Sequence, residues 1–207
     1  MNNLNAYLDA AMCLLWIFTY LVVLLGTIRY RYPLMPLATQ MAFMTHEIAI
    51  LFFLITEKDS IDYVVVAYSV WVLIEISLFL ANKKVGHISP KTTVLFICLT
   101  LFFSTVLFWL IAFKGYMTYV CYIATIIGVV CWYVAILKPK YPIKPVVLVA
   151  FLTKLIADIF VAPFYLIYET RAIGLLSVIL PMLDALYIPT YFLLRAKRNR
   201  KASIGGV

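Results

Sequence analysis

Residues 92–113 read TTVLFICLTLFFSTVLFWLIAF, a stretch without a single charged side chain. A helix needs about 20 apolar residues to cross roughly 30 Å of hydrocarbon, and this stretch meets that length. The rest of the chain has a similar character, with 66% hydrophobic and 13% charged residues among 207 and a mean hydropathy of +1.04. No soluble domain of this size can bury so much apolar surface, so the sequence predicts a polytopic membrane protein.

Seven such stretches follow one another, separated by short segments rich in proline and charge. The expected spans are about 7–28, 34–56, 61–81, 92–113, 116–137, 145–168 and 173–195. The predicted fold is therefore all-α, a single seven-helix membrane domain over residues 1–207 with a basic tail at 196–207. Because the connections are short, consecutive helices are expected to pack antiparallel beside each other, and any function must lie between them.

Cations are distributed unevenly between the two sets of connections. One set, with the tail, holds thirteen of the seventeen Lys and Arg residues, and the other holds only Lys58, Lys114 and Arg171. The positive-inside rule then places the N-terminus outside or in the lumen and the C-terminus in the cytosol. The membrane would be the endoplasmic reticulum in a fungus or the plasma membrane in a bacterium. The basic residues are interpreted as topology signals and anionic-lipid contacts rather than as a nucleic-acid site.

Four of the nine carboxylates fall inside the predicted spans: Glu47, Glu75, Asp158 and Asp184. A central Asp costs about 2.5–3.5 kcal/mol on the mildest insertion scales, so such groups are functional candidates by default. Lys154 lies four residues before Asp158, which favours an ion pair within one helix. Glu47 and Asp184 have no such partner in their own segments, although Asp184 bonding to a facing hydroxyl and Glu75 reaching the interface remain structural alternatives.

Aromatic side chains recur at helical spacing on the faces that carry these acids. Phe43 shares a face with Glu47, Tyr68 and Trp71 share one with Glu75, and Tyr187 shares one with Asp184. Tyr122 lies on a similar face of the fifth span. These residues, with Lys154 and Asp158, are the predicted substrate-binding set. His46 points about 100° away from Glu47, so it need not share that site.

Acid groups among aromatic walls in a dry cavity suit carbocation chemistry. A carboxyl group removed from water favours its neutral, proton-bearing form, and aromatic faces stabilise cations within about 6 Å. The sequence contains no DDxxD or DxDD cluster, no HExxH, no GxSxG and no lysine in the seventh span. DDxxD would support ionisation of a prenyl diphosphate, HExxH metal-assisted hydrolysis, GxSxG acyl transfer, and a lysine in the seventh span a retinal Schiff base. A chemistry without metal or cofactor is therefore expected.

Three short motifs resemble the small seven-helix integral-membrane terpene cyclases of fungal meroterpenoid and indole-diterpene pathways. They are Met35-Pro36-Leu37 followed by Glu47, Trp71-x-x-x-Glu75, and Asp184-x-x-Tyr187. The chain departs from the family pattern at Phe43 and His46, where the family has Asn and Trp, and thus resembles a divergent member. The resemblance implies that an acid protonates the terminal epoxide of a lipophilic prenyl chain, which then closes into rings. It implies Glu47 and Asp184 as essential acids, with Glu75 as a third.

Two other functions fit the same residues. Buried acids are also what proton relays use, so a proton-coupled carrier of a small hydrophobic or cationic solute is the main alternative. The absence of an internal repeat and of paired broken helices speaks against it. A non-catalytic sensor or assembly subunit is the third. The substrate, the ring pattern and the oligomeric state are left open by the sequence.

Overall fold

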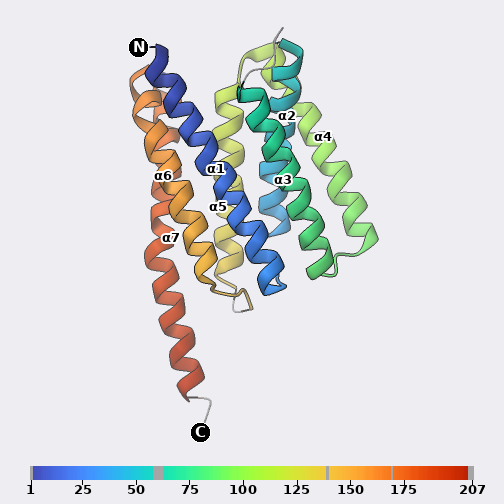
Figure 1. Cartoon of the computed structure of the whole chain (residues 1–207), viewed down its shortest axis with the longest axis vertical. Helices are drawn as coiled ribbons and strands as arrows, with labels where there is room; N and C mark the ends of the chain where they lie inside the picture. Colours follow the sequence, from blue (N-terminus) through green and yellow to red (C-terminus); the bar gives the residue numbers. More distant parts are fainter. Residues whose placement is uncertain (1, 58–62, 139, 169, 205–207) are drawn as a thin grey trace.

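Seven α-helices account for all regular structure in the described part of the chain (Figure 1). The computed structural model describes residues 2–57, 63–138, 140–168 and 170–204, with their side chains except at 2–10, 63, 161–168 and 201–204. The helices are α1 (Asn2–Tyr30), α2 (Leu37–Glu57), α3 (Tyr63–Val85), α4 (Pro90–Lys114), α5 (Met117–Ile136), α6 (Pro145–Tyr168) and α7 (Arg171–Ile204). The predicted all-α class is confirmed for the described residues, and each helix overlaps one of the predicted stretches.

Six of these helices are long and apolar enough to cross a membrane. They are α1 over Ala11–Tyr30, α2, α3 over Val64–Val85, α4, α5, and α7 over Arg171–Arg200. Helix α6 has 24 residues, of which only 145–160 have described side chains. Large apolar side chains such as Leu95, Phe102 and Trp109 are exposed on the outer surface. The surroundings that suit this surface are a lipid bilayer.

The helices alternate in direction along the bundle (Figure 1). The α1–α2, α3–α4 and α5–α6 connections lie at one end together with the C-terminal part of α7. This end carries the predicted cation-rich set, including Arg31, Lys84 and Lys138, and is called the basic end below. The N-terminus lies at the opposite end.

Six helices form a closed ring in the order α1, α3, α2, α5, α7, α6, and α4 lies outside it against α2. The expectation that all consecutive helices pack side by side is wrong. It holds closely for α2–α3 and α6–α7, whereas α1 packs against α3 and α6 instead of α2. The physical reason is polarity. Helix α4 has the highest mean hydropathy of the candidate spans and suits lipid, while the helices that carry buried acids need protein neighbours.

Helix α4 has well-formed ends. The Ser89 side chain accepts a hydrogen bond from the Thr92 N–H at 3.1 Å, and Pro90 occupies the first turn. At the other end Gly115 adopts φ +65°, and its N–H bonds to the Ile111 carbonyl. Glycine adopts this left-handed conformation without the steric cost that a Cβ brings. Ser104 donates a 3.0 Å hydrogen bond to the Thr45 carbonyl and so attaches α4 to α2.

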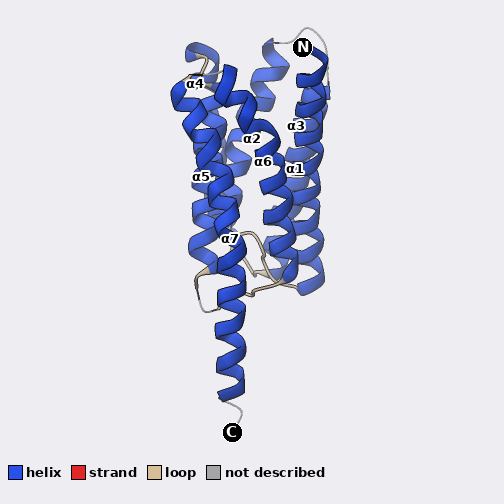
Figure 2. Cartoon of the chain, turned by 90° about the vertical axis from the view of Figure 1, so that its left-hand side faces the viewer, coloured by secondary structure: helices blue, strands red, loops and turns tan. Residues whose placement is uncertain are grey.

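Helix α7 continues through Pro181 and Pro189 and includes most of the predicted tail, up to Ile204. At 1.5 Å per residue its 34 residues span about 51 Å. Since the hydrocarbon layer is only about 30 Å thick, the helix exceeds it. Its basic last turns extend beyond the other helices (Figure 2).

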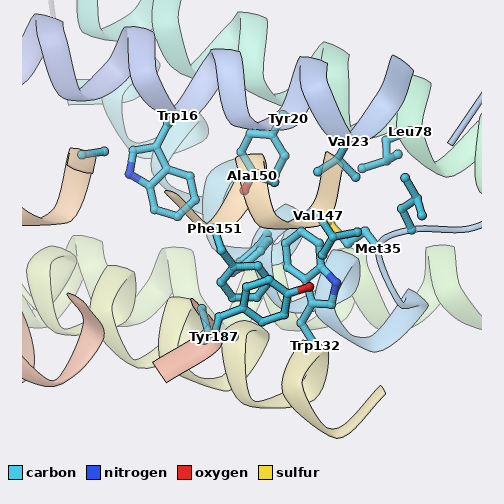
Figure 3. Packing of buried hydrophobic residues seen from close by; sticks show 14 of the residues in the cluster. Trp16, Tyr20, Val23, Met35, Leu78, Trp132, Val147, Ala150, Phe151 and Tyr187 are labelled. Atoms are coloured by element: carbon cyan, nitrogen blue, oxygen red, sulfur yellow. The ribbon is translucent and has the colours of Figure 1, made fainter. Parts of the chain in front are cut away.

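The core between α1, α5, α6 and α7 is built largely from aromatic rings (Figure 3). Phe151 and Tyr187 stack with their ring centroids 4.0 Å apart and an angle of 15° between the planes. Trp132 lies beside Phe151 at 4.8 Å. Large interlocking rings fix the relative positions of the three helices that carry them.

Candidate functional site

All six ring helices contribute to one cavity of about 140 Å³, and the outer helix α4 contributes nothing to it. Its lining comes from the half of each helix that is farther from the basic end, or from its middle. The lining residues are Met12, Trp16, His46, Glu47, Tyr68, Trp71, Met117, Thr118, Cys121, Tyr122, Thr125, Asp158, Ser177 and Leu180. The cavity is therefore a property of the closed ring, since no two helices could form it.

Glu47 lies at mid-length of α2, at the deep end of this cavity, and is 2% exposed. The Tyr20 hydroxyl of α1 donates a 2.6 Å hydrogen bond to its Oε1. Its Oε2 has no hydrogen-bond partner among the described residues. One oxygen is thus held in place while the other remains available to a molecule in the cavity.

The cavity walls are aromatic on the α1, α3 and α5 sides. Tyr68 and Trp71 meet edge to face, with centroids 4.7 Å apart, and Trp16 approaches Trp71 at 6.4 Å. Tyr122 completes the set from α5. These rings surround a small volume, and an aromatic ring attracts a cation that lies over its face.

His46 also lines the cavity. Its Nδ1 lies 3.1 Å from the Ala42 carbonyl, so this nitrogen is the one that carries a proton. The ring meets Phe43 edge to face. Although His46 and Glu47 are about 100° apart on the helix, both reach the cavity because the ring curves around it.

On the opposite side of the ring, Lys154 joins two carboxylates. Its Nζ lies 2.6 Å from Asp158 Oδ2 on α6 and 2.5 Å from Asp184 Oδ2 on α7. The ammonium also lies 4.9 Å from the Trp16 ring centroid. The predicted pairing of Lys154 with Asp158 is confirmed. Asp184, expected to stand alone, shares the same lysine, and only Asp158 of the two carboxylates reaches the cavity.

Glu75 lies behind Glu47 and is completely buried. Neither of its carboxyl oxygens has a hydrogen-bond partner in the part of the chain described, although the group interacts electrostatically with Glu47 and with Tyr20. Gln40 Nε2 donates to the Glu75 backbone carbonyl at 2.8 Å, and Asn82 Nδ2 donates to Gln40 Oε1 at 3.0 Å. A buried polar row therefore runs from Glu47 toward the basic end.

The predicted site residues divide into two groups. Those at the cavity are Glu47, Tyr68, Trp71, Tyr122 and Asp158. Those packed behind its wall are Phe43, Glu75, Lys154, Asp184 and Tyr187. Phe43 packs closely on Gly128, and Tyr187 stacks on Phe151. The structure thus brings the predicted site residues into one region of the bundle. Half of them, however, are separated from the cavity by packed side chains.

Two important residues on α1 were missed in the sequence. Tyr20 holds Glu47, and Trp16 contacts both the cavity and Lys154. A usable signal exists, because Trp16 and Tyr20 are four residues apart and share one helix face. The first span carries no carboxylate among its central residues, so the signal that marked the other candidate faces is missing there.

Possible metal ligands are few. Across the residues described here, no group of three or more His, Cys, Asp or Glu side chains gathers in a way that could hold a metal ion. Two carboxyl groups line the cavity, Glu47 from α2 and Asp158 from α6, and they lie on opposite walls. What the arrangement offers chemically is proton donation, proton acceptance and stabilisation of positive charge.

Comparisons with protein families, with curated proteins and with solved structures were each negative, and no match was found for this chain. The site is accordingly defined by its own geometry, as an aromatic cavity with a hydrogen-bonded glutamic acid at its deep end.

Proposed function

We propose that this chain is an integral-membrane terpene cyclase, in which Glu47 starts the reaction by protonating a lipophilic prenyl or epoxyprenyl chain. The observation that carries the proposal is the state of Glu47. It is buried at the deep end of an aromatic cavity, with one oxygen bonded to Tyr20 and the other oxygen without a partner. Since no cation pairs with Glu47 among the described residues, its neutral form is the stable one in this environment.

The reaction follows from the groups around the cavity. Glu47 transfers its proton to an epoxide oxygen or to a terminal alkene carbon. The C–O bond or the π bond of the substrate breaks as a neighbouring double bond supplies electrons for a new C–C bond. The positive charge then moves along the chain, stabilised by Trp16, Trp71 and Tyr122. A final C–H bond loses its proton to the Asp158 carboxylate on the opposite wall, which leaves a double bond.

The cavity volume limits how much of the substrate is enclosed. A cavity of about 150 Å³ accommodates a benzene-sized molecule, and the present volume of about 140 Å³ is similar. One ring at a time therefore fits beside Glu47. The remainder of a prenyl chain must lie outside this volume, in the lipid, where its apolar carbons are stable.

The proposal includes seven spans and a fixed orientation. Helix α6 has 24 residues, which at 1.5 Å each cover about 36 Å and can cross the hydrocarbon. With the basic end in the cytosol, as the positive-inside rule requires, the cavity faces the lumen or the cell exterior. Attaching a reporter enzyme after Ile204 and before Asn2 tests the two sides.

The deciding experiment is product analysis in a membrane host supplied with prenylated substrates, with and without a terminal epoxide. The wild-type chain should form a cyclic product, and Glu47→Gln should abolish it while still accumulating in the membrane. Glu57→Gln, on the exposed end of the same helix, is the matched control and should remain active. Unchanged product from Glu47→Gln would show that Glu47 is not the acid.

A second candidate function is proton-coupled transport of a small cationic solute. The observation that favours it is that a cavity in one half of the bundle is followed by a buried polar row toward the basic end. The cavity is also of the right size for a small ammonium ion, with carboxylates on two walls. It predicts uptake driven by a pH gradient in proteoliposomes, which a cyclase would not show.

A further inference from the structure

Glu75 is the buried acid that the proposed reaction does not use. It is fully buried, contributes nothing to the cavity wall, and has no hydrogen bond to either carboxyl oxygen among the described residues. Among the described residues no lysine or arginine pairs with it, and the buried Lys154 is held by Asp158 and Asp184. Leaving such a group in a dry interior costs stability, so its place calls for a functional reason.

Four polar residues on α2 and α3 show how Glu75 and Glu47 are placed along their helices. Gln40 and Glu47 are seven residues apart on α2, and Glu75 and Asn82 are seven apart on the antiparallel α3. Seven residues are almost two full turns, so each pair lies on one helix face. The Asn82–Gln40 hydrogen bond fixes the register of the two helices. It thereby places the two carboxylic acids at the same level.

Tyr20 is the group that connects them. Its hydroxyl donates its single proton to Glu47, and a hydroxyl oxygen can accept a hydrogen bond at the same time. Glu75 interacts electrostatically with this hydroxyl. A protonated Glu75 carboxyl can supply the missing donor, which would satisfy both the tyrosine oxygen and the buried acid.

We propose that Tyr20 passes protons from Glu75 to Glu47, so that Glu75 is the proton reserve that restores the acid after each cyclisation. This inference rests on the proposed function of Glu47. Tyr20 is a positioning and relay residue, since it contacts the acid and does not itself line the cavity.

The proton balance is simple. When Glu47 has given its proton to the substrate, its Oε1 takes the proton of the Tyr20 hydroxyl. Tyr20 oxygen takes the proton of Glu75 in the same movement. The tyrosine ends neutral, Glu47 is again protonated, and the negative charge is left on Glu75. A hydronium ion from water then reprotonates Glu75, while the proton released from the product leaves by way of Asp158.

The basic end supplies a route for that water. Asn82 lines a second cavity of about 290 Å³, together with Tyr32, Gly86 and Lys138. Asn82 thus borders this cavity, and its Oδ1 has no hydrogen-bond partner in the described residues. Water bound there would be connected to the region of Glu75 through the hydrogen-bonded side chains of Asn82 and Gln40. Glu75 would then be reprotonated from the basic end, on the side opposite to the substrate.

Infrared difference spectroscopy of the purified protein in lipid nanodiscs tests the link without any substrate. The C=O stretch of each protonated acid is assigned by its loss in Glu47→Gln and in Glu75→Gln. Tyr20→Phe should then shift both bands, whereas Tyr133→Phe, which removes a buried hydroxyl from α5, should shift neither. A shift of the Glu47 band alone, of neither band, or the lack of a protonated Glu75 band overturns the relay.

Two further measurements keep the inference separate from the proposed function. If Tyr20→Phe does not fold, Glu75→Gln decides, because it should still shift the Glu47 band through Tyr20. With an active substrate, Glu75→Gln should complete the first turnover at the wild-type rate and then slow by about tenfold or more. An unchanged steady-state rate contradicts the relay. Failure of the wild type to form any product contradicts the cyclase but leaves the spectroscopic result standing.

Discussion

Lys154 of α6 and Asp184 of α7 form an ion pair of 2.5 Å between two side chains that are both at most 1% exposed. The pair joins two neighbouring ring helices at the level of the cavity. Since Asp158 shares the same ammonium, one cation serves two carboxylates. Asp158 and Asp184 are therefore part of a charged cluster, whereas the hydrogen-bond partner of Glu47 among the described residues is the Tyr20 hydroxyl.

Replacing Lys154 by Met should destabilise the protein strongly. It leaves two carboxylates in a dry interior without a cation, and breaking a buried pair in this way costs about 3–5 kcal/mol. Thermal unfolding in detergent micelles measures the effect. Lys91→Met, at an exposed lysine, should unfold like the wild type. A Lys154→Met protein as stable as that control would mean that the cluster is not charged.

Asp158→Asn and Asp184→Asn should differ in activity but not in stability. Each leaves Lys154 with one carboxylate, so both proteins should unfold near the wild-type temperature. Only Asp158 faces the cavity, and loss of a positioned base lowers turnover by about 10²-fold or more. Turnover assays on this matched pair decide between them. A greater loss in Asp184→Asn would assign the acceptor role to the residue behind the wall.

Gly128→Ala should destabilise the bundle, although alanine normally favours a helix by about 1 kcal/mol over glycine. A Cβ at this position of α5 would overlap the Phe43 ring of α2, and such overpacking costs about 1–3 kcal/mol. Thermal unfolding should show rescue by the second change Phe43→Leu. Stabilisation by Gly128→Ala alone would mean that the ring can move aside.

Tyr141→Phe should lower stability by about 1–3 kcal/mol. The phenol donates to the Leu34 carbonyl and accepts from Trp132 Nε1 at 3.0 Å, so its loss leaves two buried groups without partners. Tyr116→Phe, at an exposed tyrosine, is the control in the same unfolding measurement. Equal stability of the two variants would contradict the assigned hydrogen bonds.

Burial raises the pKa of Tyr141. The folded state therefore favours the neutral phenol, and its contribution is complete below the ordinary tyrosine value of about 10 and declines as the pH rises beyond it. The stability difference between the wild type and Tyr141→Phe should accordingly be constant at neutral pH and shrink in strong alkali. A difference that grows with pH would contradict this.

The helices were predictable because the signal for each is local. Each expected span overlaps its helix, and capping residues such as Ser89 and Gly115 explain the ends of α4. The ion pair of Lys154 with Asp158 was likewise visible, since a spacing of four residues within a helix implies contact.

The ring order and the second partner of Lys154 were not predictable. Whether Asp184 or another acid meets Lys154 depends on the rotation of α7 against α6, which the aromatic stack of Phe151 on Tyr187 sets. Apolar faces on every side of these helices give no periodic signal for that rotation. The role of Tyr20 was hidden for the same reason, because its partner lies 27 residues away on a helix that does not pack closely beside α1.

The ring order has a consequence for synthesis. Helix α1 is made before the other six helices, but one of its two main neighbours, α6, is made more than a hundred residues later. Until then the growing chain holds Glu47 and Glu75 in an unfinished enclosure open to lipid, and chains synthesise at only about 5–20 residues per second. The nascent protein must therefore keep these two acids in an incomplete ring for at least several seconds.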